Sequence, residues 1–174
     1  MDSLARIERS IRNIPDFPRP GIQFKDITPV LADPDLFNLV LELLSGPFLN
    51  QGVTKIVAIE ARGFILGGAL AARFGAGFVP VRKKGKLPYQ ALAESYDLEY
   101  GSDSVEMHVD GIGKNDRVLI HDDVIATGGT AAASRALVQR AGGTVVGFTF
   151  LIELGFLNGR ARLGDDNVHA VVRY

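Results

Sequence analysis

The chain has 174 residues, of which 47% are hydrophobic and 22% charged, as in an ordinary soluble domain. Its 19 Lys and Arg residues nearly balance 20 Asp and Glu residues, and a net charge of −1 argues against a dedicated nucleic-acid binder. The absence of cysteine excludes disulfides, thiolate nucleophiles and Cys-ligated metal sites. The N-terminus lacks an apolar targeting core, and the most apolar stretch, residues 63–72, is shorter than the ~20 residues that span a bilayer. We therefore expect a cytoplasmic protein with no membrane or nucleic-acid partner.

The first quarter of the sequence predicts two helices separated by a loop. Leu4, Ile7 and Ile11 recur at helical spacing and predict a short amphipathic helix over about 3–12. The prolines and glycine of IPDFPRPGIQFKDITP then favour an ordered loop. Asp33 followed by Pro34 is a typical helix start, and the apolar stripe after it predicts a helix that ends near residue 46.

The remaining sequence alternates apolar strands with helices. Strands are predicted at 55–59, 77–82, 117–121, 144–152 and 168–174, and helices at about 64–74 and 128–141. Residues 83–108 form a long excursion that favours a two-stranded ribbon. The alternation predicts an α/β fold with a central, mostly parallel sheet flanked by helices. Ligands of such sheets bind at the carboxyl ends of the strands, so the loops that follow the strands are the expected site.

The segment RVLIHDDVIATGGTAAA carries the strongest functional signal. An apolar strand runs into Asp122 and Asp123, and the Gly- and Thr-rich loop 126–130 then opens a helix. Free N–H groups, the helix dipole and two threonine hydroxyls would make this loop a phosphate cradle, although the P-loop lysine is absent. Two carboxylates would repel a neighbouring phosphate unless they bind hydroxyl groups or a metal ion. A ribose diol donates two hydrogen bonds and can help to chelate Mg²⁺. Either piece alone favours a capped helix or a solvated acidic turn, but together they predict a ribose 5-phosphate site.

This segment resembles the phosphoribosyl pyrophosphate (PRPP) signature of type I phosphoribosyltransferases, which some transcription regulators share. From about residue 11 to 163 the chain is similar to the adenine phosphoribosyltransferase family, through DFPRPGIQFKDITPVL, EARGFILGGALA, VRKKGKLP and YDLEYG. The resemblance implies one phosphoribosyltransferase domain over 1–174. Within it, residues 1–33 would form an N-terminal helix and a base-binding hood, and residues 83–108 a flexible catalytic loop. It also implies that PRPP and adenine give AMP and pyrophosphate, with Mg²⁺, in a homodimer.

The resemblance assigns roles to the residues of the phosphate and pyrophosphate loops. PRPP and AMP would bind to Asp122, Asp123, Ala126, Thr127, Gly128, Gly129 and Thr130. Mg²⁺ would be held mainly through PRPP, with Asp122 or Asp123 as the candidate protein ligands. Pyrophosphate would bind to the loop of Glu60, Ala61 and Arg62, whose Glu60-Ala61 peptide is often cis in the family. Arg62, whose guanidinium matches a phosphate in bidentate fashion, would also be catalytic.

Three further assignments depend more heavily on the resemblance. The basic cluster at 82–86 would ordinarily be a solvated turn, but the resemblance implies that Arg82, Lys83 and Lys86 bind pyrophosphate, partly across a dimer interface. Glu99 is by itself an ordinary strand carboxylate, and the resemblance makes it a catalytic residue near N7 of adenine. Adenine would contact Phe17, Gln23 and Lys25 in the hood, although the family commonly has Arg at the place of Lys25. His121 is expected to be a packed or hydrogen-bonded strand residue, although the sequence does not explain why a plain aliphatic residue does not stand there.

Two alternative functions stay open at this point. Main-chain groups can read a base without a diagnostic side chain, so the acceptor could be xanthine, hypoxanthine or orotate. A non-catalytic regulator that senses PRPP or a nucleotide is disfavoured, since no helix-turn-helix precedes the core. The presence of Arg62, the basic cluster and Glu99 also counts against such a sensor.

Overall fold

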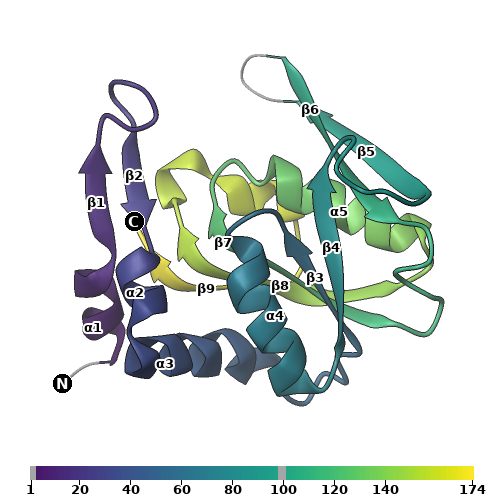
Figure 1. Ribbon diagram of the computed structural model, residues 1–174, viewed down its shortest axis with the longest axis horizontal. Helices are drawn as coiled ribbons and strands as arrows, with labels where there is room; N and C mark the ends of the chain where they lie inside the picture. The colour runs from purple at the N-terminus through teal and green to yellow at the C-terminus, as the bar shows by residue number, and fades with distance from the viewer. Residues whose placement is uncertain (1–2, 98–100) are drawn as a thin grey trace. The chain divides into compact units, whose positions relative to one another are not determined.

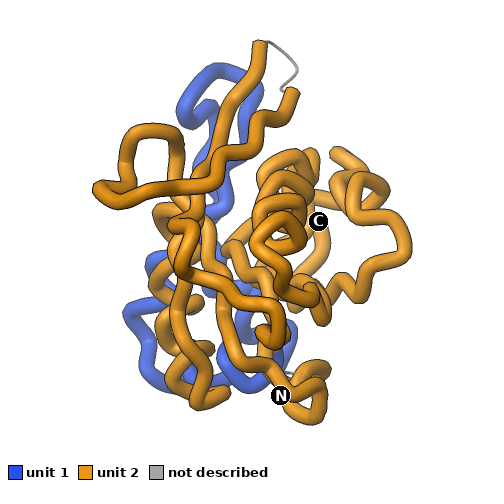
Figure 2. Tube along the Cα trace, turned by 90° about the vertical axis from the view of Figure 1, so that its right-hand side faces the viewer, with its two compact units in different colours: residues 1–43 blue, residues 44–174 orange. Residues whose placement is uncertain are grey.

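The computed structural model describes residues 3–97 and 101–174. It consists of two compact units, Met1–Leu43 and Leu44–Tyr174, which are coloured separately in Figure 2 and described one after the other here. Within the described ranges, no helix is long and apolar enough to cross a bilayer.

The first unit contains α1 (Ser3–Ser10), β1 (Arg12–Pro15), β2 (Gln23–Asp26), α2 (Thr28–Ala32) and most of α3 (Pro34–Ser45). The predicted first helix is confirmed, with an earlier end. The helix start at Asp33 is confirmed as well, because its Oδ1 accepts hydrogen bonds from the backbone N–H groups of Asp35 at 2.9 Å and Leu36 at 3.1 Å.

The proline-rich segment is not wholly a loop. β1 and β2 pair as an antiparallel ribbon, with Ile14 opposite Phe24. The turn between the strands is closed by the Asp16 carboxylate, which accepts a hydrogen bond from the N–H of Gly21 at 2.7 Å. Gly21 has a φ of 85°, which glycine adopts without strain. The prolines obscured the ribbon because they sit at the end of β1 and in the turn, where no ladder hydrogen bond is lost.

The second unit is built on a seven-stranded sheet with the order β5-β6-β4-β3-β7-β8-β9, drawn in Figure 1. Its strands are β3 (Lys55–Ile59), β4 (Gly77–Lys83), β5 (Ala91–Asp97), β6 (Ser102–His108), β7 (Arg117–Ile125), β8 (Thr144–Glu153) and β9 (Val168–Arg173). Its helices are α4 (Gly63–Phe74) and α5 (Gly129–Arg140), with short 3₁₀ turns η1 (Gly46–Phe48), η2 (Gly155–Leu157) and η3 (Gly159–Leu163). The pairings of β3, β4, β7, β8 and β9 are parallel, which confirms the predicted mostly parallel α/β sheet. β5 and β6 form the predicted antiparallel ribbon, and β6 joins it to β4.

Alternate residues of the central strand β3 pack on the two faces of the sheet. Ala58 lies under α4, where Gly67 comes so near that a Cβ built on it would be 2.5 Å from the Cβ of Ala58. Val57 and Ile59 belong instead to the core that contains Leu137 and Val138 of α5. Helices therefore cover both faces of the sheet, as Figure 1 also shows, and this explains why the strands read as continuous apolar runs.

β7 extends further than the sequence predicted. It continues through both acids to Ile125, and Asp122 pairs with Phe150 of β8. The prediction stopped at His121 because carboxylates are depleted in buried strands. Here Asp122 is tolerated because it lines a pocket at the carboxyl end of the strand, and the buried Asp123 because it pairs with Arg62.

The close approach of α4 to β3 predicts opposite effects for two neighbouring glycines. Gly67→Ala should lower the free energy of unfolding by about 1–3 kcal/mol, because its methyl group would overlap Ala58 in a packed core. Gly68→Ala should instead raise it by about 0.5–1 kcal/mol, because the space beside it is open and alanine favours the helix. Urea unfolding of both variants checks this, and equal effects would contradict the packing described.

Candidate functional site

The phosphate-binding candidate and the first of the two acids, Asp122, meet in one pocket. It has a volume of about 80 Å³ and lies where β7 ends and α5 begins. Its lining consists of Asp122, Val124, Ile125, Ala126, Gly128, Thr130, Ala131 and Phe150. The first-turn N–H groups of α5 are unpaired within the helix, so this end of the pocket favours an anion. The structure thus places one predicted acid beside the predicted loop; Thr127 and Gly129 belong to the loop without lining the pocket.

Two glycines hold the phosphate loop against a distant segment. Gly128 has a φ of 79°, and a Cβ built on it would overlap the carbonyl oxygen of Gly159 in η3. A Cβ built on Gly159 would in turn overlap the carbonyl oxygen of Ala126. The two backbones therefore touch, and only glycine fits at either place. Sequence reasoning missed Gly159, since nothing local distinguishes it from a glycine in an ordinary turn.

The acidic pair is joined to the predicted pyrophosphate loop. Asp123 is 5% exposed, and its Oδ2 lies 2.8 Å from Nε of Arg62. Asp122 accepts a hydrogen bond from the N–H of Asp123 at 2.9 Å. Burial, and then the adjacent Asp123 carboxylate, raise the pKa of Asp122 well above its usual range. A carboxyl that resists ionisation in this way favours a cation or hydroxyl donors beside it.

The start of α4 lies close to the acidic pair. The Glu60-Ala61 peptide is cis, as the resemblance implied. Arg62 follows at the N-cap of α4, and a Cβ built on Gly63 would lie 2.8 Å from Oδ1 of Asp122. Gly63 thus lets the loop after β3 approach the carboxyl end of β7. The two loops predicted to hold the two ends of PRPP are neighbours in the structure.

Glu60 connects the same loop to the basic cluster. Its Oε1 accepts a hydrogen bond from the backbone N–H of Lys83 at 2.5 Å, and its Oε2 lies 3.3 Å from Nη2 of Arg82. Arg82 also donates from Nη1 to the carbonyl of Lys86 at 3.2 Å. Because β3 and β4 are parallel neighbours, the loops that follow them meet, and Glu60 fixes one to the other.

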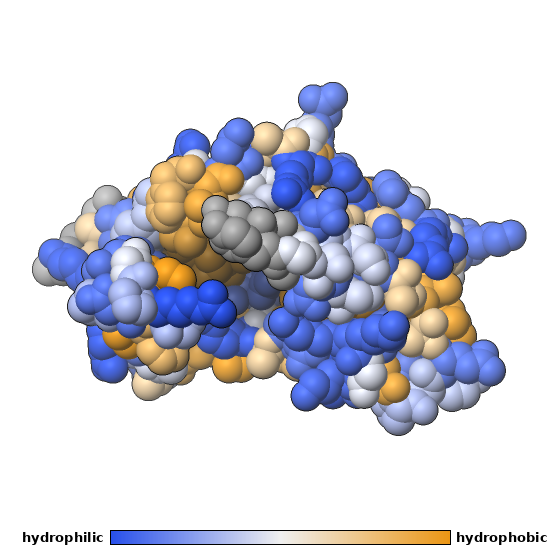
Figure 3. Space-filling view, turned by 90° about the horizontal axis from the view of Figure 1, so that it is seen from above, coloured by the Kyte–Doolittle hydropathy of each residue, from blue (hydrophilic) through white to orange (hydrophobic). Residues whose placement is uncertain are grey.

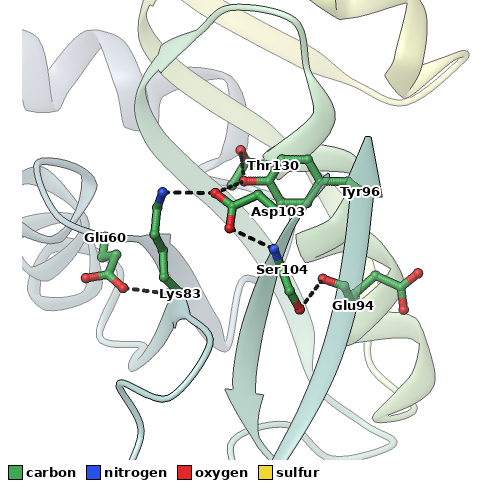
Figure 4. A network of polar contacts seen from close by, with 7 residues as sticks. All are labelled: Glu60, Lys83, Glu94, Tyr96, Asp103, Ser104 and Thr130. Carbon is green, nitrogen blue, oxygen red and sulfur yellow. Dashed lines mark hydrogen bonds and ion pairs between the residues drawn. The ribbon is translucent and has the colours of Figure 1, made fainter. Parts of the chain in front are cut away.

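A polar network extends from the basic cluster to the phosphate loop (Figure 4). Nζ of Lys83 lies 2.9 Å from Oδ2 of Asp103, to which the hydroxyl of Tyr96 also donates at 3.4 Å. Tyr96 accepts a hydrogen bond from the hydroxyl of Thr130 at 3.1 Å. Tyr96 and Asp103 face each other across the β5–β6 ribbon. Sequence reasoning missed both residues, because the sequence did not indicate which residues of the predicted ribbon would pair with each other.

The predicted adenine contacts lie in the first unit. Gln23 and Lys25 are both on β2 and, two residues apart, lie on the same face of the ribbon. Gln23 accepts a hydrogen bond from Nδ2 of Asn13 at 2.8 Å. Phe17 lies in the turn with half of its surface exposed and packs edge-on against Phe24. The ribbon thus brings the three predicted residues onto one small element. Glu99 falls outside the residues that the structure describes.

His121 is a buried residue of the sheet. Its Nδ1 lies 2.8 Å from the carbonyl oxygen of Thr149 on β8, so Nδ1 carries the proton and donates it. Its Nε2 is buried with no hydrogen-bond partner among the described residues. Burial lowers the pKa of His121 to about 4, so the ring is neutral in the folded protein at pH 7. Its role is in packing and strand pairing, which answers the question that the sequence left open.

His121 predicts a loss of stability in mild acid. The folded-state pKa of about 4 lies below the value of roughly 6.5 in an unfolded chain, so protons favour the unfolded state. The stabilising contribution is complete above pH 6.5 and decreases as pH falls toward 4, by as much as about 3 kcal/mol. Urea unfolding at several pH values between 7 and 5 should show that the free energy of unfolding falls less steeply with decreasing pH in His121→Leu than in the parent chain. The same dependence on pH in both proteins would contradict this assignment.

The donor set around the pocket contains few metal ligands. Among residues 3–97 and 101–174, no group of three or more His, Asp or Glu side chains is placed to hold a metal ion. The acidic pair offers two carboxylates, and Mg²⁺ is commonly held by one or two carboxylates together with substrate phosphates. The residues present therefore fit a magnesium ion that arrives with a phosphorylated ligand.

Figure 3 shows that hydrophilic residues cover much of the molecular face seen from above.

Comparisons with known proteins agree with this geometry. Residues 29–172 match the model of the phosphoribosyl transferase domain. An adenine phosphoribosyltransferase of Myxococcus xanthus is 56% identical over 98% of this chain and 93% of its own length. The crystal structure of an adenine phosphoribosyltransferase from Rhodothermus marinus superposes with a TM-score of 0.96, at 64% identity over 99% of this chain and 98% of that one. One from Saccharomyces cerevisiae, complexed with an imino-altritol bisphosphate and adenine, gives 0.91 at 38% identity over 97% and 98%. The chain therefore belongs to the phosphoribosyl transferase domain family.

Proposed function

We propose that this protein transfers the 5-phosphoribosyl group of PRPP to adenine, giving AMP and pyrophosphate, a step of purine salvage. The observation that carries the proposal is the pocket in which Asp122 lies beside the loop of Ala126, Gly128 and Thr130. It combines acceptors for a sugar diol with donors for a phosphate. Relatives that are half or more identical to this chain are adenine phosphoribosyltransferases, which supports adenine as the acceptor.

The phosphate of PRPP would bind at the N-terminus of α5. Backbone N–H groups of the loop 126–130 and the hydroxyl of Thr127 supply donors, and the helix dipole adds positive potential. The hydroxyl of Thr130, which donates to Tyr96 in this structure, would turn to the phosphate. The ribose diol would then reach the acidic pair and donate to Asp122 and Asp123. Such positioning lowers the barrier by holding the reacting carbon of the ribose against the base.

The cations around the cis peptide would stabilise the departing pyrophosphate. Arg62 lies at the N-cap of α4, and Glu60 of the same loop holds Arg82 and the backbone of Lys83. Lys86 completes the basic cluster. The leaving group gains negative charge as the bond to the ribose breaks, so cations fixed beforehand stabilise the transition state more than the ground state.

Magnesium fits this arrangement as a cofactor that binds with PRPP. It would be held mainly by the substrate, with Asp122 or Asp123 as a protein ligand, and it would neutralise charge on the pyrophosphate.

The hood over residues 1–33 would supply the base site, with Phe17, Gln23 and Lys25 against adenine. Glu99 would act near N7 of the base, where a carboxyl can help to handle the purine's proton and fix its tautomer. A flexible loop over 83–108, closing over the substrates, would keep water from hydrolysing PRPP. We also propose a cytoplasmic homodimer in which some of the basic residues act across the interface.

The choice of base is the part of the proposal that a direct assay decides. Purified protein with PRPP and Mg²⁺ is given adenine, hypoxanthine, guanine, xanthine and orotate in parallel, and nucleotide and pyrophosphate are both measured. We expect AMP from adenine and no product from the other bases. Turnover of another base would overturn the assignment of the hood, and PRPP binding without any turnover would favour a sensor.

The role of Glu99 predicts a selective loss of turnover. Glu99→Gln should lower kcat by about 10²–10⁴-fold, because an amide cannot exchange a proton with the base, while the KM for PRPP changes little. Glu94→Gln on β5 is the matched control, since Glu94 lies in the same segment 83–108 but pairs with Arg140 at 2.9 Å and is assigned no contact with a substrate. Steady-state kinetics check the pair of variants. Equal kcat values for both would remove Glu99 from the catalytic residues.

A further inference from the structure

Three cations assigned to pyrophosphate already have a carboxylate partner within the chain. Arg62 pairs with Asp123 and Arg82 with Glu60, and in both pairs the acid is a residue to which the proposed function assigns a role in the site. The third pair differs, because Lys83 contacts Asp103, a residue of the β6 strand to which the proposed function assigns no contact with a substrate. An acid that neutralises an anion-binding lysine requires a physical explanation.

The acid of this pair is fixed, and the lysine is not. Asp103 accepts hydrogen bonds from the N–H of Ser104 at 2.8 Å through Oδ1 and from the Tyr96 hydroxyl through Oδ2. Its side chain is 26% exposed, whereas that of Lys83 is 62% exposed. A lysine ammonium on a flexible stem can turn to another acceptor at little cost. The carboxylate therefore stays in place while the ammonium can exchange partners.

The pair also lies close to the phosphate pocket. Tyr96 accepts a hydrogen bond from Thr130, which lines the pocket, and donates one to Asp103. Figure 4 shows Lys83, Asp103, Tyr96 and Thr130 as one continuous chain of contacts. The hydrogen bond and charge of Asp103 raise the pKa of Lys83. Any anion that recruits Lys83 must therefore compete with a carboxylate that is already bonded to it.

We propose that Asp103 is a positioning residue that competes with pyrophosphate for Lys83. This inference rests on the proposed function, in which Lys83 contributes to the pyrophosphate site. When pyrophosphate is absent, Asp103 keeps the ammonium at the edge of the site. When pyrophosphate binds, it must displace Asp103 from Lys83, which weakens binding and eases release of the product.

Removal of the competing charge should tighten pyrophosphate binding. Asp103→Asn leaves the side chain's shape but abolishes its charge, and a partly exposed ion pair of this kind corresponds to about a two- to fivefold change in Kd. Glu94→Gln is the matched control, because it removes the same charge from the same ribbon, at a pair with Arg140. Asp103→Glu keeps the charge and should leave Kd within about twofold of the parent value.

The experiment is a calorimetric titration of each variant with magnesium pyrophosphate at low ionic strength, with a thermal melt to verify folding. A lower Kd for Asp103→Asn alone supports the competition, and a variant that merely damaged the fold would bind less tightly, not more. An unchanged or higher Kd for Asp103→Asn, or an equal decrease in Glu94→Gln or Asp103→Glu, overturns it. If the parent chain binds no pyrophosphate, the basic cluster is not a pyrophosphate site and both proposals fail together.

Discussion

The parallel pairing of β3 with β4 on one side and β7 on the other determines where everything else can lie. Parallel strands end on the same edge of a sheet, so three loops distant in sequence are brought together at one place. One contributes the cis peptide and Arg62, the next the basic cluster, and the third the acids and the phosphate loop. Without this pairing, the charged residues of these three segments would lie far apart.

Once the loops meet, their charges compensate one another. Arg62 pairs with Asp123 and Glu60 with the basic cluster, so each group is partly neutralised before any ligand arrives. Burying unpaired charges of either sign would destabilise the fold. The pairs also hold long side chains in defined places, which reduces the ordering that a ligand must impose. The same contacts thus serve the stability of the chain and the readiness of the site.

The sequence predicted the α/β fold and most element boundaries because the strands are apolar on both faces and glycines mark their ends. It also predicted that the acids and the loop 126–130 form one site, since the two motifs are contiguous in the chain. It did not reveal Tyr96 and Asp103, whose meeting depends on the register of a ribbon. It extended β7 too little, because Asp122 and Asp123 oppose the usual rule for buried strands. The ribbon in residues 12–26 was hidden by prolines that are harmless at its end and in its turn.

The contact between Gly128 and Gly159 means that the shape of the phosphate pocket depends on two separate segments of the chain. The loop's curvature depends on η3, to which the proposed function assigns no ligand-binding residue. Redesign of the pocket for a bulkier sugar phosphate would therefore fail if it altered the loop alone, since the backbone at Gly159 leaves the loop no room to move back. Both backbone segments would have to be redesigned together.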